Sequence, residues 1–297
     1  MAATDDSVDD DALYVLTAAL LTPARFPAVL GDDYAQACAA LGLEPYPGGY
    51  GLVMGQDGAG ARWTVVIDDV SLVAVAIASW DCGMEYDLSP DERSVVSALP
   101  GWPLALSVAA PGVPAPHDPR PADAADHEAT EDSGAGESTV RLPLSPPDTA
   151  TWGPAQRRLG ADEVALQWAL WRERFEGAGD AAAETPGAPG PAASDTSEDG
   201  GTPAPSHPGV VRALAGLRAY VDADTAPPPL GRVRSGFAPD EARTLRADGP
   251  GWSFVARTDD MAFVLLDEEP GEVLPVGRGT ELPGLLTALD GIAVHPA

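Results

Sequence analysis

Apolar and polar positions alternate between helix-like and strand-like patterns along most of the chain. Residues 33–41 carry Tyr34, Cys38 and Leu41 at spacings of four and three, which predicts an amphipathic helix. Segments rich in β-branched or apolar residues, separated by Gly-rich or Asp-Asp turns, predict strands. In the first half we therefore expect helices at 10–21 and 33–41 and strands at 51–54, 62–67 and 72–79.

A helix-to-strand motif occurs twice. Residues 89–92 read Ser-Pro-Asp-Glu, a capping box that predicts a helix to Leu99, and Pro-Gly-Trp at 100–102 then leads into a strand. Residues 238–241 read Ala-Pro-Asp-Glu, and a short predicted helix is again followed by Pro-Gly-Trp, at 250–252, and a strand. One inserted residue aligns the two copies, so we expect an internal duplication.

The remaining segments complete two similar halves of the α+β class, each a mainly antiparallel sheet with packed helices. The strand that begins at Trp252 is expected to pair with a strand at 261–267 through the turn at residues 258–260. The other expected elements are strands 102–108, 139–144 and 231–237 and helices 162–175, 210–221 and 280–289.

Composition divides the chain into domains and linkers. Two stretches are rich in Pro, Ala, Gly and acidic residues, the N-terminus is acidic, and all three contain almost no large apolar side chain. Such segments cannot bury enough apolar surface to offset the entropy of ordering them, so we expect them to be disordered. The expected organisation is a disordered N-terminus at 1–9, a first domain at 10–176 with a disordered insert at 109–138, a disordered linker at 177–207 and a second domain at 208–294.

In element order, the two halves resemble the type III secretion chaperone and YbjN-like fold. The residues that carry the resemblance are the two Pro-Asp-Glu helices and the strands that follow Trp102 and Trp252. The resemblance implies a protein that binds peptide segments of other proteins rather than one that catalyses a reaction. It also implies that a tandem pair imitates, within one chain, the dimer that such chaperones often form.

The basic residues exclude several classes of enzyme. All 17 basic residues are arginine, because the sequence contains no lysine. A Walker A loop, a protein kinase and a Schiff-base enzyme each need a lysine. A very GC-rich genome produces the same bias, so the absence of lysine is not by itself evidence of function.

The four histidines lie in segments that we read as linkers or tail. His117 and His127 fall in the predicted insert, His207 in the predicted linker and His295 near the C-terminus. Histidine is the commonest general base and metal ligand. A Ser-His-Asp triad or a histidine-containing zinc site is therefore not expected, and carboxylate chemistry is what catalysis would have to use. We expect no cofactor, no metal and no catalytic residue.

The net charge of −29 bears on the partners. An acidic surface repels phosphate backbones and anionic lipids, so neither nucleic acid nor membrane is expected to bind. No basic region precedes the short apolar run near the N-terminus, and Cys38 and Cys82 are too few for a disulfide framework. We therefore expect a cytoplasmic protein in which both cysteines are small buried side chains.

An aromatic stripe is the first candidate binding element. Trp168, Trp171 and Phe175 follow Val164 at helical spacing on one face of the predicted helix 162–175. Beside a disordered linker, this stripe could dock a partner. The alternative is that it is the closing helix of the first domain and that its aromatic side chains lie in the core.

A second candidate is the segment Trp80-Asp81-Cys82-Gly83-Met84-Glu85-Tyr86, at the end of the predicted strand 72–79. Its aromatic residues, Trp80 and Tyr86, could contact a partner at a strand end. Cys82 could also act as a nucleophile, but a cysteine without a neighbouring base is a weak one. The alternative is that the segment is an ordinary loop whose side chains pack against the domain.

Charged residues provide two further candidates. The pairs Asp68-Asp69 and Asp259-Asp260 could hold Mg²⁺ or Ca²⁺, but hairpin turns favour aspartate for structural reasons. Arginine clusters could bind an anion, although surface ion pairs are the simpler interpretation. The arginines in question are Arg157, Arg158, Arg232, Arg234, Arg243 and Arg246.

The sequence thus leaves two hypotheses of different classes. The favoured one is a non-enzymatic, chaperone-like adaptor that binds another protein or a peptide segment. The other is a carboxylate-dependent enzyme, which could use a divalent cation. A flat or grooved apolar surface would support the first, and a deep pocket lined by converging acids would support the second.

Overall fold

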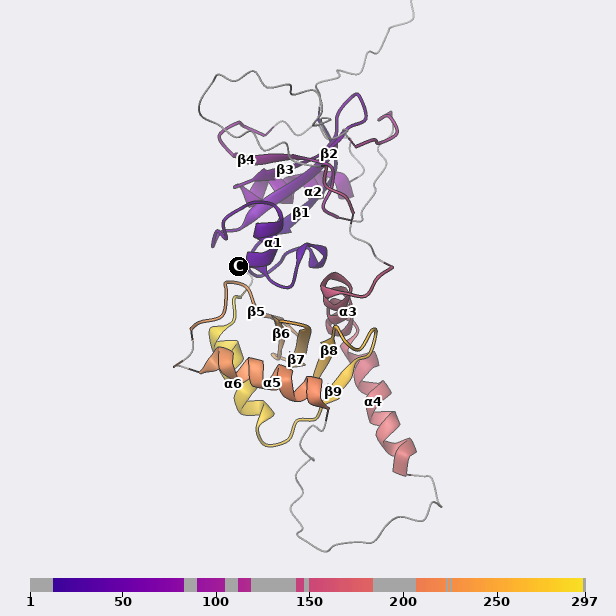
Figure 1. The fold of residues 1–297 in the computed structure, drawn as a ribbon, viewed down its shortest axis with the longest axis vertical. Helices are drawn as coiled ribbons and strands as arrows, with labels where there is room; N and C mark the ends of the chain where they lie inside the picture. The colour runs from indigo at the N-terminus through magenta and orange to yellow at the C-terminus, as the bar shows by residue number, and fades with distance from the viewer. Residues whose placement is uncertain are drawn as a thin grey trace, which may run out of the picture. The chain divides into compact units, whose positions relative to one another are not determined.

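The computed structural model shows two compact units, each built on one antiparallel sheet (Figure 1). Unit 1 comprises residues 1–30 and 39–149, and unit 2 comprises residues 31–38 and 150–297. The predicted α+β class is confirmed. The structure describes residues 13–82, 90–104, 112–118, 143–146, 150–183, 207–222, 224 and 226–295.

Unit 1 contains a four-stranded sheet in the order β1-β2-β3-β4. All three strand pairs are antiparallel. Helix α2 packs on β1 and β2. The elements are β1 (Tyr14–Leu21), a short 3-10 helix (Ala28–Leu30), β2 (Tyr50–Gln56), β3 (Arg62–Ile67), α2 (Val70–Asp81) and β4 (Val95–Pro100).

The core between α2 and this sheet is apolar. Val53, Val65 and Ile67 from the strands pack with Val73 and Ala76 of the helix. The helix lies so close to β2 that a Cβ atom on Gly51 would be 1.9 Å from the Val73 Cγ2 atom. Glycine at position 51 therefore allows the close approach of helix and strand.

Unit 2 contains a five-stranded antiparallel sheet in the order β5-β6-β7-β8-β9. Helices cover both faces of the sheet. The elements are α1 (Tyr34–Ala40, whose first five residues belong to unit 2), α3 (Pro154–Leu166), α4 (Trp168–Ala183), α5 (Pro208–Val221), β5 (Val233–Phe237), β6 (Arg243–Gly249), β7 (Trp252–Arg257), β8 (Ala262–Leu266), β9 (Leu274–Val276) and α6 (Leu282–Ile292).

Alternating side chains of the strands build a different core on each face of the unit 2 sheet. On one face, Trp252 and Phe254 pack with the apolar sides of α5 and α6. On the other, Val255 and Phe263 pack with α3 and α4. The helices predicted at 210–221 and 280–289 and the pairing of β7 with β8 are confirmed.

Two elements of unit 1 have the opposite type from the predicted one. Residues 14–21 form β1, although a helix was expected, and residues 70–81 form α2, although most of them were expected in a strand. The alternation of β-branched residues (Val73, Val75 and Ile77) with Ala in 73–78 imitates a strand. The Asp69 carboxylate, which accepts a hydrogen bond from the Ser71 backbone N–H at 2.9 Å, caps a helix instead.

The two predicted Pro-Asp-Glu helices are strands. Residues 91–94 and 239–242 form turns, closed by the Ser94 N–H to the Asp91 carbonyl and by the Ala242 N–H to the Pro239 carbonyl, and β4 and β6 follow. In β6, polar and apolar residues alternate with a period of two, which is the strand pattern.

The internal duplication is not confirmed. Gly101 and Gly251 share a positive φ, 79° and 77°, so the two Pro-Gly-Trp turns are locally similar. Pro-Gly at 250–251 closes the β6-β7 hairpin. After β4, by contrast, Gly101 forms an isolated parallel bridge with Leu144, and the Trp102 N–H donates to the Leu144 carbonyl. The rest of the expected strand 102–108 lies largely outside the described residues.

The predicted domain boundaries shift because of packing. The expected helix 162–175 is two helices, α3 and α4, and α3 packs on β7 and β8, so it belongs to unit 2 rather than to the first domain. Helix α4 continues to Ala183, into the predicted linker 177–207. Within the predicted insert 109–138, the described residues 112–118 lie against β2 and β3, where Gln56 Nε2 donates to the Pro114 carbonyl. The predicted N-terminal segment 1–9 and the rest of both linkers lie outside the described residues.

Candidate functional site

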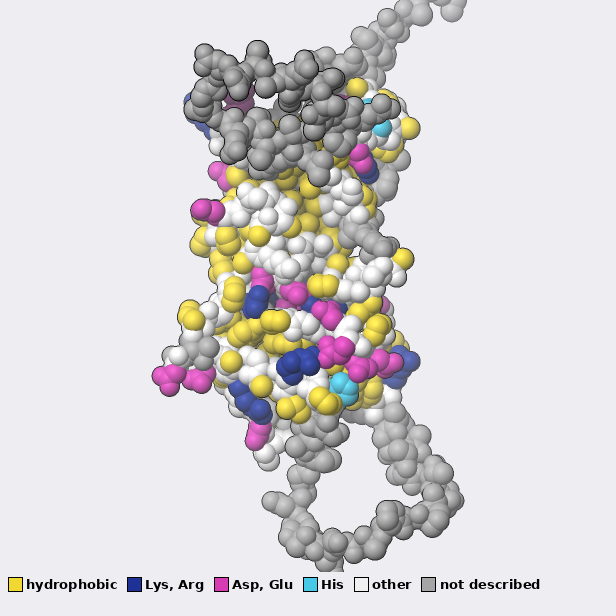
Figure 2. All heavy atoms as spheres, viewed as in Figure 1, with side chains coloured by type: hydrophobic (Ala, Val, Ile, Leu, Met, Phe, Trp, Pro, Cys, Tyr) yellow, Lys and Arg dark blue, Asp and Glu magenta, His cyan; other side chains and the backbone are white. Residues whose placement is uncertain are grey.

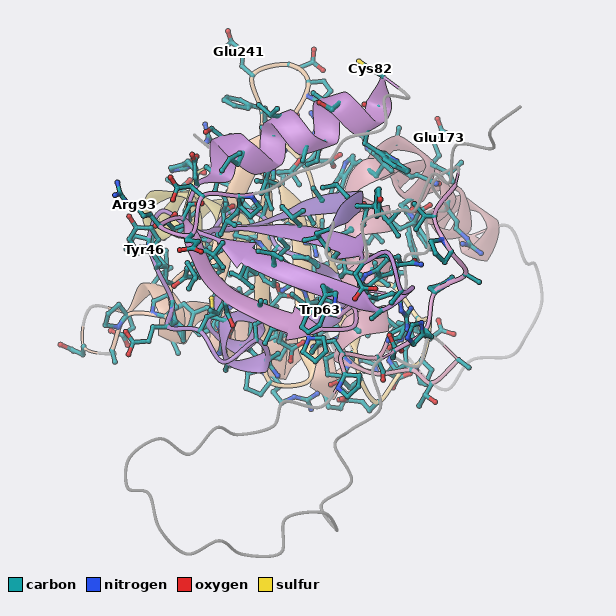
Figure 3. All side chains as sticks on the ribbon, turned by 90° about the horizontal axis from the view of Figure 1, so that it is seen from above. Tyr46, Trp63, Cys82, Arg93, Glu173 and Glu241 are labelled. Carbon is teal, nitrogen blue, oxygen red and sulfur yellow. The ribbon has the colours of Figure 1, made fainter. Side chains whose placement is uncertain are left out.

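The outer face of α2 is the candidate functional site, and we call it the α2 face. The helix buries Val73, Ala76 and Ser79 against its sheet, a spacing of three residues that defines the inner side. The outward positions carry small or aliphatic side chains. No residue from Val70 to Trp80 is charged. Figure 3 shows α2 beside the sheet of unit 1, with Cys82 at its C-terminal end. The α2 face consists of Ser71, Ala74, Val75, Ile77 and Ala78.

This face is solvent-exposed and apolar. Val75 is 49% exposed and Ile77 is 38% exposed. Ala74 and Ala78, four residues apart, are also exposed, and such small side chains leave a shallow groove between larger neighbours. A helix on the surface of a globular protein normally presents charged or polar residues to water. An apolar strip of this kind is typical of a surface that another molecule covers.

Carboxylates lie at both ends of the α2 face. Asp68 and Asp69 precede the helix and Asp81 ends it, all exposed. The Asp69 pKa is lowered by hydrogen bonds from Ser71, so this carboxylate is ionised over the whole neutral range. Near the first end, the Asp68 N–H donates to the Ser94 carbonyl at 3.0 Å, and the exposed side chain of Arg93 precedes Ser94.

The predicted partner-binding residues are distributed over both units. Trp80 lies at the C-terminal end of α2 and is half-buried, one turn beyond Ile77. Tyr86 lies outside the described residues. Cys82, expected to be buried, is exposed, whereas Cys38 is buried and its thiol pKa is raised by that burial.

The aromatic stripe of α4 lies in the core of unit 2. Trp168 is 7% exposed, and its ring packs edge-on against Phe263 with 5.1 Å between the ring centroids. The centroid of the Phe175 ring lies 5.5 Å from that of Phe263, and Trp171 stacks with Phe175. This geometry supports the alternative that the stripe lies in a core. The core is that of unit 2, however, and not that of the predicted first domain.

Four of the six arginines are buried in unit 2, which corrects the expectation of surface ion pairs for them, whereas Arg232 and Arg243 are partly exposed. Arg157 and Arg158 are 0% and 1% exposed, and Arg234 and Arg246 are nearly as inaccessible. The centre of the cluster is Asp248, which accepts from Arg158 Nη1 at 2.6 Å and from Arg234 Nη2 at 2.9 Å. Ser253 donates to its second oxygen at 2.7 Å. Arg157 and Arg158 project from α3, whereas Arg234, Arg246, Asp248 and Ser253 project from the face of β5, β6 and β7 that also carries Val255.

The segment 31–38 completes this cluster within unit 2. Asp32 pairs with Arg157, and Asp33 pairs with Arg232. Burial raises the pKa of Asp32, although Arg157 opposes the shift, whereas Arg158 and Arg234 hold the pKa of Asp248 below its ordinary value despite its burial. The cluster therefore consists mainly of permanently charged pairs, which fix the positions of chain segments and do not exchange protons near neutral pH.

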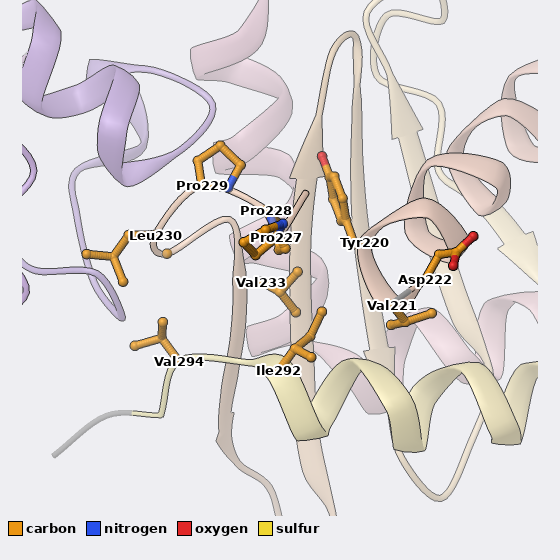
Figure 4. A pocket seen from close by; sticks show the side chains of 11 residues that line it. Tyr220, Val221, Asp222, Pro227, Pro228, Pro229, Leu230, Val233, Ile292 and Val294 are labelled. Atoms are coloured by element: carbon orange, nitrogen blue, oxygen red, sulfur yellow. The ribbon is translucent and has the colours of Figure 1, made fainter. Parts of the chain in front are cut away.

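An apolar pocket of about 390 Å³ lies in unit 2 (Figure 4). Pro227, Pro228 and Pro229 line it together with Ile292 and Val294, which follows α6. The Val294 N–H and carbonyl bond to β5, so this residue covers an edge of the sheet. The pocket has apolar walls, and the Tyr220 hydroxyl at its rim is already bonded to the Asp248 carbonyl.

A second pocket in unit 2, of about 380 Å³, contains carboxylates. Its acids are Glu173, Asp240, Asp259 and Asp260. Arg257 pairs with Asp259 and lowers its pKa, and Asp260 accepts from Trp168 Nε1 at 3.1 Å.

The predicted cation sites have structural partners. Asp69 caps α2, and Asp259 and Asp260 are held by Arg257 and Trp168. Within the part of the chain that the structure describes, no group of three or more His, Cys, Asp or Glu side chains is arranged to hold a metal ion.

Three histidines contact folded elements, contrary to the expectation that all four lie outside them. The His117 N–H donates to the Gly60 carbonyl, His207 Nε2 is 3.3 Å from the Glu269 carboxylate, and His295 Nδ1 is 2.7 Å from Arg243 Nη2. His127 lies outside the described residues. The three thus lie beside a backbone carbonyl, a carboxylate and a guanidinium group, respectively.

Sequence reasoning missed the α2 face because it assigned the segment to a buried strand. The signal that could have found it is the combination of Asp69 at a capping position with the three-residue spacing of Val73, Ala76 and Ser79. Comparisons of the chain with protein-family models, curated proteins and solved structures give no match. Among the described residues, no helix is both long and apolar enough to cross a membrane.

Proposed function

We propose that this chain is a non-enzymatic, cytoplasmic protein-binding module of the adaptor or chaperone-like kind, and that the α2 face is its binding surface. The observation that carries the proposal is an exposed helix face without a single charged side chain in a chain of net charge −29. Water solvates such a strip poorly, and burial of apolar surface contributes about 25 cal/mol per Å². A partner that covers Val75 and Ile77 removes their apolar surface from water, and this burial contributes favourably to the free energy of binding.

The neighbouring features support this proposal. Trp80 lies at the end of the strip, and a half-buried tryptophan is a frequent anchor in interfaces. The inner side of α2 is fixed by the close packing of Val73 on Gly51, so the outer side is presented on a rigid element. A preformed surface loses little entropy when it binds.

One observation favours the alternative, a carboxylate-dependent enzyme. The second pocket of unit 2 brings four carboxylates together beside Trp168. Two of them are engaged by arginine or by the indole N–H, and the Asp259 pKa is lowered. General acid catalysis requires the opposite shift, because the acid must still hold its proton near neutral pH. The pocket therefore gives weaker support to the enzyme than the α2 face gives to the binder.

The test is a pair of matched substitutions. Val75 in α2 and Val211 in α5 are almost equally exposed, 49% and 48%. Full-length wild type, Val75→Glu and Val211→Glu are used as baits in native cell extract, and captured proteins are quantified by mass spectrometry. We expect a set of proteins that wild type and Val211→Glu retain and that Val75→Glu loses at least tenfold.

Site-specific photo-crosslinking from position 75 provides the direct readout. A crosslinker placed at 75 should label a retained protein, and one placed at 211 should not. Equal recovery with all three baits, together with no crosslink from position 75, would exclude the α2 face as a binding surface.

A further inference from the structure

The charges at the ends of the α2 face select the kind of partner. The strip itself is neutral, so it attracts any apolar surface equally. Its two ends carry only exposed carboxylates on the helix and its cap: Asp68 and Asp69 at the N-terminal end and Asp81 at the C-terminal end. The exposed Arg93 also lies near the first end, but two exposed acidic residues, Asp91 and Glu92, directly precede it in the chain. A partner thus meets negative charge beyond both ends of the apolar contact.

The shape of the strip suits an α-helix. Helix α2 has 12 residues, or about 18 Å of helix at 1.5 Å per residue. Along the middle of its outer side run the small side chains of Ser71, Ala74 and Ala78, and the larger Val75 and Ile77 lie on opposite flanks of that line. Ridges of a second helix pack into such grooves, and small residues let the two axes approach closely. About three turns of a partner helix match the length of α2, so they span the strip and extend to the carboxylates at its two ends.

A second copy of the chain fits this surface poorly. Two α2 helices packed antiparallel would bring Asp68 and Asp69 of one copy next to Asp81 of the other. Packed parallel, they would oppose identical carboxylates. Both arrangements bring like charges next to one another, which is unfavourable, and the net charge of −29 adds long-range repulsion.

Resting on the proposed function, we infer that the partner of the α2 face is a helical segment of another protein, with an apolar face about three turns long and Lys or Arg residues flanking it at both ends. The apolar contact supplies affinity, and the flanking cations pair with Asp68 and Asp81. Such complementary charges steer the encounter and set the selectivity among apolar helices.

Three synthetic peptides test the inference with the full-length chain. All have the same central amphipathic helix of about three turns, and they differ only in the flanks, which are Lys and Arg, Gln, or Glu. Affinity is measured by fluorescence anisotropy at low and high salt. We expect the basic-flanked peptide to bind at least about tenfold more tightly than the Gln-flanked one and the Glu-flanked peptide to bind most weakly, with the differences shrinking at high salt.

Variants assign the effect to named residues. The double variant Asp68→Asn, Asp81→Asn should lose the preference for basic flanks and keep the affinity for the Gln-flanked peptide. Asp69 is left intact because it caps the helix. Val75→Glu should abolish binding of the Gln-flanked and Glu-flanked peptides, and Val211→Glu should change nothing.

The outcomes separate the two proposals. Equal affinity for all three flanks would overturn the inference and leave the α2 face as a binding surface. A concentration-dependent dimer in sedimentation, lost in Val75→Glu, would also overturn it, because the occupant would then be a second copy. Peptide binding that is insensitive to Val75→Glu would overturn the proposed function as well.

Discussion

Helices α2 and α5 each cover one face of an antiparallel sheet, but their outer sides differ. The outer side of α5 carries Arg212 and Arg218, which pair with Glu268 and Glu281. Figure 2 shows basic and acidic side chains interspersed with apolar ones on the face of unit 2 that carries α5. The outer side of α2 carries no charged side chain from Val70 to Trp80, and the first charge on the helix is that of its last residue, Asp81. An exposed valine is therefore ordinary on α5 and informative on α2, because only on α2 is it part of a continuous apolar strip.

The two units also place their charges differently. In unit 2, arginine and aspartate side chains are buried on the α3 side of the sheet, around Asp248. In unit 1, the core under α2 is built from aliphatic side chains. A chain rich in acids can thus bury charge where arginines neutralise it and still leave one neutral face exposed. The neutral α2 face is therefore not a result of a shortage of polar residues in the chain, 21% of which is charged.

The largest effect is expected from Asp248→Asn in unit 2. Removal of the central carboxylate leaves the buried Arg158 and Arg234 without their shared partner, which should cost about 3–5 kcal/mol of unfolding free energy. Urea unfolding gives the total, and hydrogen exchange locates the loss in unit 2. A cost below about 1 kcal/mol would mean that the charges are not desolvated as the structure indicates.

The difference in unfolding free energy between wild type and Asp248→Asn should depend on pH. The Asp248 pKa is lowered in the folded state from its ordinary value of 3.8, so its contribution is complete above 3.8 and is lost as the pH falls through the folded pKa. The stability difference between wild type and Asp248→Asn should therefore shrink below pH 3.8. A constant difference down to strongly acidic pH would contradict this assignment.

Trp102→Ala and Trp252→Ala should each cost about 3–4 kcal/mol, because both indoles are buried. Trp252 fills the space over Gly249 and Gly216 under α5, and Trp102 Nε1 donates to the Gly55 carbonyl at 3.3 Å. Hydrogen exchange should place the two losses in different units. A large loss at one position and none at the other would show that the two Pro-Gly-Trp turns are not comparable in packing.

Gly51→Ala should destabilise unit 1 by about 1–3 kcal/mol, because the new methyl group would overlap Val73 and Ile67 and push α2 away from β2. Gly236→Ala in β5 is the matched control. A Cβ there meets only the Thr244 carbonyl oxygen, at 4.0 Å. Thermal unfolding of both variants checks the expectation, which fails if Gly51→Ala is as stable as Gly236→Ala.

The smallest effect on stability is expected from Val75→Glu and Val211→Glu. Exposed substitutions usually change the unfolding free energy by less than about 0.5 kcal/mol, so both variants should unfold like wild type. Binding should nevertheless separate them, since only position 75 lies in the apolar strip. A stability loss at position 75 alone would point to a structural role for this side of α2.

The sequence predicted much of unit 2 and part of unit 1, where the expected strands 51–54 and 62–67 form as β2 and β3. Helices α5 and α6 and the β7-β8 pair have a strong period and clear turns, and they form as expected. The alternation of β-branched residues with Ala in α2 satisfies a strand pattern as well as a helical one, and the Pro-Asp-Glu motifs satisfy a turn as well as a cap. In these segments, packing chose between two local solutions of similar energy.

For the candidate site, the sequence pattern predicted Trp80, at the end of the α2 face, but did not predict the face itself. The pattern also indicated Trp168, Trp171 and Phe175, whose periodicity is the same whether they face a core or a partner. Burial against Phe263 is a property of a contact between segments almost 100 residues apart, which no local pattern reports.

The sequence by itself determined the charge of the chain, the lysine-free set of basic residues, the α+β class and the helices whose apolar stripes are unambiguous. Only the tertiary structure decided which of two local conformations α2 and β6 adopt, which arginines are buried, and that α3 packs on the second sheet. The physical reason is that composition and period are properties of each segment alone. Burial and charge pairing depend on which segments meet, and those contacts outweigh local propensities that differ by less than about 1 kcal/mol per residue.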